Sequence, residues 1–266
     1  SATWLGLSLA EFILPLLIVF LLTFLDWRNI WIIISIFVIV VLPIISFSLV
    51  KNIKLDSREA SNTKEAEKKI KQWKKNEVLK DYRFYIICLS MLAMPSIATG
   101  TFVYQSFIVS SKNWGPYIIA QSFMVYSVLS VITLFLSGFL IDRFSSRKLL
   151  IYMNIPLLLS TFVLYYFNTP ISSYFFLGLI GISNGLSNVL GSATWAEIYG
   201  VKYIGSIKAL TTAFMVFSTA FGTGIFGILI DNSFSIEQIA LVSGSYILIA
   251  ISLLFLIKNK LNPHYL

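Results

Sequence analysis

Charged residues are scarce in this chain of 266 residues. They make up 12% of it, whereas hydrophobic residues make up 57% and the mean hydropathy is +0.83. A soluble domain carries about 25% charged residues, so water is not the main solvent of this chain. The composition predicts an integral membrane protein.

Cysteine and histidine are nearly absent as well. Cys88, the single cysteine, lies inside an apolar run, where we expect a packed thiol rather than a disulfide. His264, the single histidine, stands in the C-terminal tail. Because the sequence shows neither a nucleophile with its base nor a cluster of metal ligands, we expect no enzymatic activity, no metal site and no cofactor.

Long apolar runs fill most of the chain. Each is long enough for a helix that crosses about 30 Å of hydrocarbon. We therefore predict an all-α, polytopic membrane protein of eight transmembrane helices, at Trp4–Leu25, Ile30–Val50, Phe84–Ile108, Tyr117–Ile141, Leu149–Phe167, Tyr174–Ala196, Ala209–Ile230 and Ile239–Ile257.

The net charge of +8 is distributed as a topology signal. When the loops are assigned alternately to two sides, eighteen of the twenty Lys and Arg residues fall on one side, and only Arg28 and Lys112 on the other. By the positive-inside rule the long loop at 51–83 and the C-terminus are cytoplasmic. Basic residues confined to the segments between long apolar runs exclude a nucleic-acid partner and favour a multi-pass membrane protein.

The loop at 51–83 is the one domain boundary that composition indicates. Its charged stretch carries a narrow apolar stripe, formed by Ile70, Trp73, Val78 and Leu79. The stripe fits a helix that lies on the anionic inner leaflet. A solvated linker fits the same residues, and both interpretations stay open.

Polar residues within the spans concentrate in the third and sixth. Asn184, Ser187 and Asn188 recur at spacings of three and four, which places them on one helical face. That face either lines a solute path or packs on another helix, since small glycines on the same span also favour close helix contact. In the third span Pro95 indicates a broken helix, a pointer to a transporter site. The predicted cavity-lining residues are Tyr104, Gln105, Gln121, Asn184, Ser187 and Asn188.

Glu11 is the only acid deep within a predicted span. A charged side chain at the bilayer centre costs about 2.5–3.5 kcal/mol on insertion scales. Desolvation would favour its neutral form, so we hypothesise that Glu11 binds a coupling proton. A structural hydrogen bond to a neighbouring helix is the alternative.

The loop after the fourth span resembles a known signature. Gly138, Asp142, Arg143 and Arg147 match the signature loop of the major facilitator superfamily, with Ser145 where that family usually has glycine. Other resemblances are the Trp27-Arg28 pair, the stretch Trp195-Ala196-Glu197, and the glycines Gly222, Gly224 and Gly227 with Asp231.

The resemblance implies a partial major-facilitator fold. Residues 1–50 would be the last two helices of the N-terminal six-helix half, 51–83 the cytoplasmic linker, and 84–266 the C-terminal half. The family's first four helices would be absent from these 266 residues and would be their missing partners. Without those helices we expect no transport.

The resemblance also implies secondary transport of a small solute by alternating access, coupled to protons or to exchange. We expect a cytoplasmic latch of Gly138, Asp142, Arg143, Arg147 and Glu197. Separate roles, with Asp142 capping the following helix and the arginines as topology signals, are the alternative.

Within the family, the chain is most similar to bacterial carriers loosely grouped with monocarboxylate transporters, which implies a cell (inner) membrane location. The similarity lies in Tyr104-Gln105 before Lys112-Asn113-Trp114-Gly115 and in the stretch Trp195-Ala196-Glu197 that leads to Tyr199-Gly200. That similarity favours an organic anion as solute, although no predicted span holds a Lys or Arg to bind one. A non-transporting receptor or scaffold on the same fold is the rival function, because a fold alone does not fix activity.

Overall fold

The computed structural model describes residues 2–50 and 71–262, apart from the side chains of residues 2–8, 11, 42 and 44–50. All regular secondary structure of these residues is helical. The elements are α1 (Ala2–Leu21), α2 (Trp27–Val50), α3 (Lys75–Val78), α4 (Tyr82–Met91), α5 (Ala93–Val103), α6 (Gln105–Lys112), α7 (Pro116–Phe144), α8 (Ser146–Leu150), α9 (Ile155–Tyr166), α10 (Ser172–Tyr199), α11 (Ile204–Asp231), α12 (Ile236–Ile257) and the 3₁₀ turn η1 (Lys258–Lys260).

Two predicted spans are interrupted in the structure. A proline accounts for one break in each, and the third span has a further break at Tyr104, between α5 and α6. The third divides into α4 and α5 at Leu92, just before Pro95, whose ring conflicts with the carbonyl of Met91. The fifth divides into α8 and α9 just before Pro156. The side-chain amide of Asn154 in this second break donates hydrogen bonds to the carbonyl and the hydroxyl of Ser90 on α4, at 2.8 and 2.9 Å. These hydrogen bonds, made at the second break, hold the two interrupted helices together.

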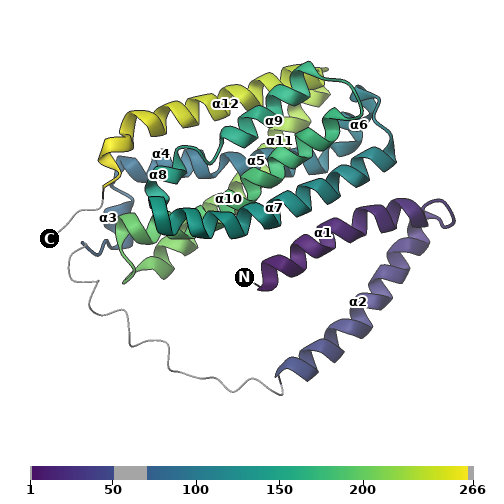
Figure 1. Ribbon diagram of the computed structural model, residues 1–266, viewed down its shortest axis with the longest axis horizontal. Coiled ribbons are helices and arrows are strands. Elements are labelled where there is room, and N and C mark those ends of the chain that lie inside the picture. Colours follow the sequence, from purple (N-terminus) through teal and green to yellow (C-terminus); the bar gives the residue numbers. More distant parts are fainter. Residues whose placement is uncertain (1, 51–70, 263–266) are drawn as a thin grey trace.

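The helices from α4 to α12 pack side by side as one elongated bundle (Figure 1). The most extensive contact joins α7 to α10, and α10 also packs on α9. On the other side α11 packs on α5, and α12 packs on α9 and α4. The helix α1 lies against α7, whereas α2 leads away from the bundle (Figure 1).

Glycines allow the close approach of α7 and α10. A Cβ atom at Gly181 would lie 2.3 Å from the carbonyl oxygen of Tyr126, and one at Gly185 would lie 2.5 Å from that of Ser130. Contacts this short exclude any larger residue unless the helices separate. The glycine face of α10 thus packs on α7, one of the two roles expected of this helix.

Six helical segments of the described residues are long and apolar enough to cross a membrane. They are Tyr82–Val103, Pro116–Phe144, Ser146–Tyr166, Ser172–Tyr199, Ile204–Asp231 and Ile236–Lys260. The apolar parts described for α1 and α2, Phe12–Leu21 and Trp27–Val41, are shorter. The total of eight spans stays a prediction.

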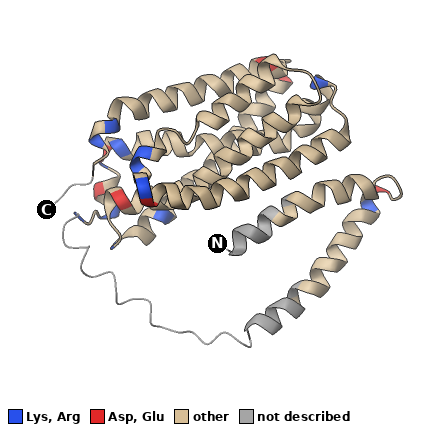
Figure 2. Ribbon diagram, in the orientation of Figure 1, with Lys and Arg blue, Asp and Glu red and all other residues tan. Residues whose placement is uncertain are grey.

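Charge gathers at the ends of the bundle. Figure 2 shows most of the described Lys and Arg residues at one end, which carries η1 and α3, and few at the other. We call these the basic end and the opposite end. Residues Gln72 to Arg83, expected within the linker, pack on the basic end, where the backbone N–H of Trp73 donates to the carbonyl of Tyr199 at 3.1 Å.

Candidate functional site

A cavity of ≈560 Å³ lies between α4, α5, α10 and α11. Its wall on α10 is one helical face, and the residues of that face recur at spacings of three and four: Asn184, Ser187, Asn188, Gly191, Ser192 and Trp195. A second face, on α4 and α5, includes Met91, Pro95 and Thr99. The Pro95 break of the third span therefore borders the cavity, as expected for a binding site of a membrane carrier.

The amide residues of α10 have hydrogen-bonding capacity left over. Asn184 donates to Ser130 on α7 at 3.0 Å, and Asn188 donates to Asn184 over a long 3.5 Å. The hydroxyl oxygen of Ser187 is buried and has no hydrogen-bond partner among the described residues. A buried hydroxyl without a partner is costly.

The other three predicted cavity residues lie elsewhere. Tyr104 sits at the break between α5 and α6, with its ring stacked on Phe226 at a centroid distance of 6.5 Å. Gln105, at the start of α6, is exposed and borders only a narrow crevice. Gln121 accepts a hydrogen bond from the Tyr174 hydroxyl at 2.6 Å on the exterior of α7. The break at Tyr104 changes the face that Tyr104 and Gln105 present, and the sequence pattern does not show this break.

Lys208 was missed as a cavity residue. The expected span began at Ala209, but α11 begins at Ile204, so Lys208 lies inside the helix and lines the cavity with Thr211, Thr212 and Met215. The expectation that no span holds a basic side chain is thus corrected. The signal available in the sequence was the spacing of 208, 211, 212 and 215, which places them on one helical face.

At the basic end, Glu197 binds the start of α8. The Glu197 carboxylate pairs with Arg147 and accepts hydrogen bonds from the Ser145 hydroxyl at 2.6 Å and from the Ser146 backbone N–H at 2.9 Å. Ser145 has φ +73°, a backbone conformation that favours glycine. Ser145 therefore has the backbone conformation expected of the glycine in the signature loop, and its hydroxyl adds a hydrogen bond to Glu197.

The remaining predicted latch residues do not join this contact. Asp142 and Arg143 are exposed at the end of α7, where the Arg143 guanidinium lies 5.5 Å from the Phe144 ring. Gly138 has open space around the position of a Cβ. Of the five, the structure brings together Arg147 and Glu197.

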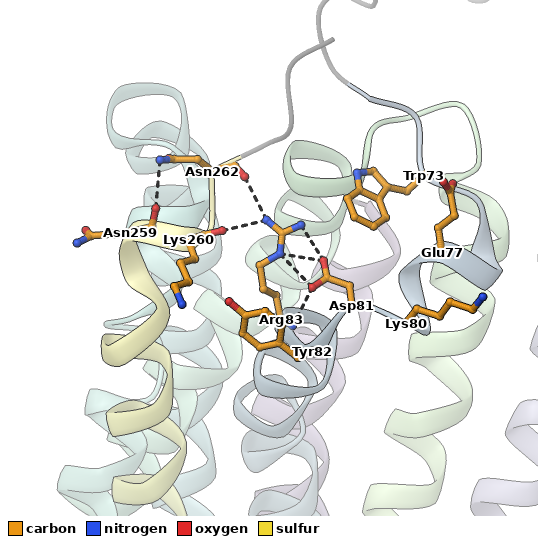
Figure 3. A pocket seen from close by; sticks show the side chains of 9 residues that line it. All are labelled: Trp73, Glu77, Lys80, Asp81, Tyr82, Arg83, Asn259, Lys260 and Asn262. Carbon is orange, nitrogen blue, oxygen red and sulfur yellow. Dashed lines mark hydrogen bonds and ion pairs between the residues drawn. The ribbon is translucent and has the colours of Figure 1, made fainter.

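A second charged cluster at the basic end was not foreseen. Asp81 and Arg83 form a buried ion pair of 2.7 Å at the start of α4, and the Tyr199 hydroxyl donates to Asp81 at 3.1 Å. Arg83 also donates to the carbonyl of Lys260 at 2.9 Å (Figure 3). A buried pair is tolerable when its remaining hydrogen-bonding groups are satisfied. The partners are up to 179 positions apart, so no local pattern indicates them.

The C-terminal segment connects the two clusters. Asn262 accepts a hydrogen bond from Arg147 at its side-chain oxygen, at 2.6 Å, and one from Arg83 at its backbone carbonyl, at 3.3 Å. Together with Trp73 and Lys80 it borders a groove of ≈610 Å³ (Figure 3). Next to this groove Glu77 accepts a hydrogen bond from the Lys74 backbone N–H and pairs with Lys71, and these contacts lower the pKa of its carboxyl.

The opposite end holds a buried lysine. The Lys112 ammonium has no exposed side-chain surface and donates to Asn168 at 2.6 Å and to Glu237 at 2.9 Å. Trp114 donates to the Asn168 carbonyl at 3.2 Å. This contact joins the end of α6 to the α9–α10 loop and to the start of α12.

Comparison with known protein families shows to which family the chain belongs. The family model described as Major Facilitator Superfamily matches residues 4–177 and residues 99–265. The chain belongs to the major facilitator superfamily. It is a multi-pass membrane protein of a transporter family, and the two matches cover nearly all of it. No curated protein and no solved structure matches the chain, so the narrower similarity to monocarboxylate carriers stays a prediction.

The structure also shows where the other residues that resemble major-facilitator motifs lie. The Arg28 guanidinium lies 5.3 Å from the Trp27 ring at the turn between α1 and α2. A Cβ at Gly222 of α11 would lie 2.3 Å from the Ser96 hydroxyl of α5, so this glycine permits the α5–α11 contact. The side chain of Glu11 lies outside the described residues, and its coupling role stays a hypothesis. Among the residues that the structure describes, no group of Asp, Glu, His or Cys could hold a metal ion.

Proposed function

We propose that this protein is a secondary active transporter that carries a small solute through the cavity between α4, α5, α10 and α11 by alternating access. The observation that carries the proposal is the polar face of α10 inside that cavity, where Asn184, Ser187 and Asn188 line the wall. Small-molecule sites are commonly cavities of about 300–1,000 Å³ with a few convergent polar groups, and a cavity of ≈560 Å³ fits this class.

Contacts at both ends of the bundle support a moving carrier. The Glu197–Arg147 contact at the basic end and the Lys112–Glu237 contact at the opposite end each join separate helices. Charged contacts at helix ends bias an element with two arrangements. In this proposal the basic end is cytoplasmic in the inner membrane, residues 1–50 belong to the N-terminal half, and 84–266 form the C-terminal half.

Coupling to protons or to an exchanged solute completes the proposal. Glu11 is the coupling candidate, because it is the only acid deep within a predicted span. A Glu11→Gln variant is expected to transport without dependence on an imposed pH gradient. Wild-type pH dependence in that variant would remove Glu11 from the mechanism.

The test is solute flux into proteoliposomes that contain the full-length protein. Organic anions, sugars and organic cations are each offered with and without a pH gradient. We expect saturable uptake of one class, and stimulation by the gradient if protons are coupled. If no class moves under any gradient, the receptor or scaffold function replaces transport.

A further inference from the structure

The described residues that line the cavity carry charge of one sign only. Of all the described residues that line it, Lys208 alone carries a charge, and none is acidic. Lys208 forms no ion pair of 4.0 Å or less with the acidic side chains that the structure describes. The fixed charge of the cavity is therefore positive.

The position of Lys208 on α11 connects it to the solute site. Lys208, Thr211, Thr212 and Met215 follow the helical spacing of one face, and that face is the α11 wall of the cavity. A lysine that served only as a topology signal could occupy any face near the basic end. This one projects from the same face as the two threonine hydroxyls and is exposed at the cavity.

The chemistry of the lining suits a carboxylate. The Lys208 ammonium donates charge-assisted hydrogen bonds, which are about twice as strong as neutral ones. The Thr212 hydroxyl and the amides of Asn184 and Asn188 supply further donors, whereas the Thr211 hydroxyl donates to the Lys208 carbonyl at 3.1 Å. The rest of the lining includes apolar groups such as Met94, suited to a short carbon skeleton.

We infer that the cavity selects small organic anions and that Lys208 is the residue that binds their carboxylate. The inference rests on the proposed transport function and adds its substrate class and a specificity-determining residue. The predicted preference for organic anions had no cation to support it, and Lys208 supplies one.

The test compares charged and uncharged forms of one skeleton. Proteoliposomes of the full-length protein take up radiolabelled lactate or succinate, each beside its amide, lactamide or succinamide. We expect wild-type uptake of an acid with a KM at least tenfold lower than that for its amide. In Lys208→Gln the KM for the acid is expected to rise about tenfold, which corresponds to about 1.4 kcal/mol, whereas Lys208→Arg stays within about threefold of wild type because it keeps the charge.

A matched control removes one surface charge from the same end. Lys202 lies outside the cavity, with its ammonium 5.6 Å from the Tyr203 ring, so Lys202→Gln is expected to keep the wild-type KM. Uptake of the amides, of sugars or of cations with no uptake of acids overturns the anion inference and leaves transport standing. An unchanged KM in Lys208→Gln overturns the role of Lys208. No uptake of any solute overturns the proposed function and this inference with it.

Discussion

Ser145 combines a strained backbone with a useful side chain. Its φ of +73° costs a residue with a side chain about 1–3 kcal/mol, and its hydroxyl donates to Glu197. Ser145→Ala keeps the strain and loses the hydrogen bond, whereas Ser145→Gly loses both. We expect the Ala variant to unfold at least about 2–4 °C below the Gly variant, as measured by thermal unfolding in detergent. Equal Tm values would show that the backbone is not strained there.

Sequence patterns located some single residues and missed others. The signature loop identified Ser145 as a glycine position, and the face of Asn184, Ser187 and Asn188 was found from spacing alone. Lys208 was missed because hydropathy rises only at Ala209, while the helix begins five residues earlier, at Ile204. Tyr104 does not line the described cavity, because it occupies a helix break that no local sequence feature indicates.

At the scale of elements, the contact of α7 with α10 depends on glycine. A methyl group at Gly181 would lie 2.3 Å from the Tyr126 carbonyl oxygen, so Gly181→Ala must separate the helices and cost about 1–3 kcal/mol. Gly191 is the matched control, since no heavy atom lies within 4 Å of its Cβ position. Thermal unfolding should show a lower Tm for Gly181→Ala and no decrease for Gly191→Ala, since alanine favours the helix where space allows. A neutral Gly181→Ala would contradict the close packing.

Element positions were predictable where a long apolar run met a clear stop. The runs gave α7, α10 and α12 to within three residues at each end, because polar loops bound them. The interruption at Leu92 was predicted from Pro95. The interruption just before Pro156 was not predicted. Short helices such as α8 carry too few residues for a periodic signal.

At the scale of the whole molecule, the contact of Glu197 with Arg147 ties α10 to α8 and, through Asn262, to the C-terminal segment. If it biases the carrier toward one arrangement, Glu197→Gln should change the transport rate several-fold while the protein still folds. Glu77→Gln is the control, because Glu77 also pairs at the basic end but is exposed. Rates in Glu197→Gln equal to those in the control would leave this contact without a role in the transport cycle.

The large-scale plan of the protein was the most predictable part. Basic residues counted by side indicated which loops lie together, and Figure 2 shows them at one end. The contact of the buried Asp81–Arg83 pair with Lys260 could not be predicted, because Arg83 and Lys260 are 177 positions apart in the sequence. Tertiary packing alone brings them together.

Passage of solute through the cavity is tested most directly by accessibility at Asn188. In a Cys88→Ala background, Asn188→Cys is reacted with a membrane-impermeant maleimide added to either side of the membrane, with and without a transported solute. We predict modification that solute slows and whose side changes with the solute gradient. Phe139→Cys, on an exposed apolar face of α7 that we expect to contact lipid, should stay unmodified. Modification at 188 that no solute or gradient alters would contradict transport through this cavity.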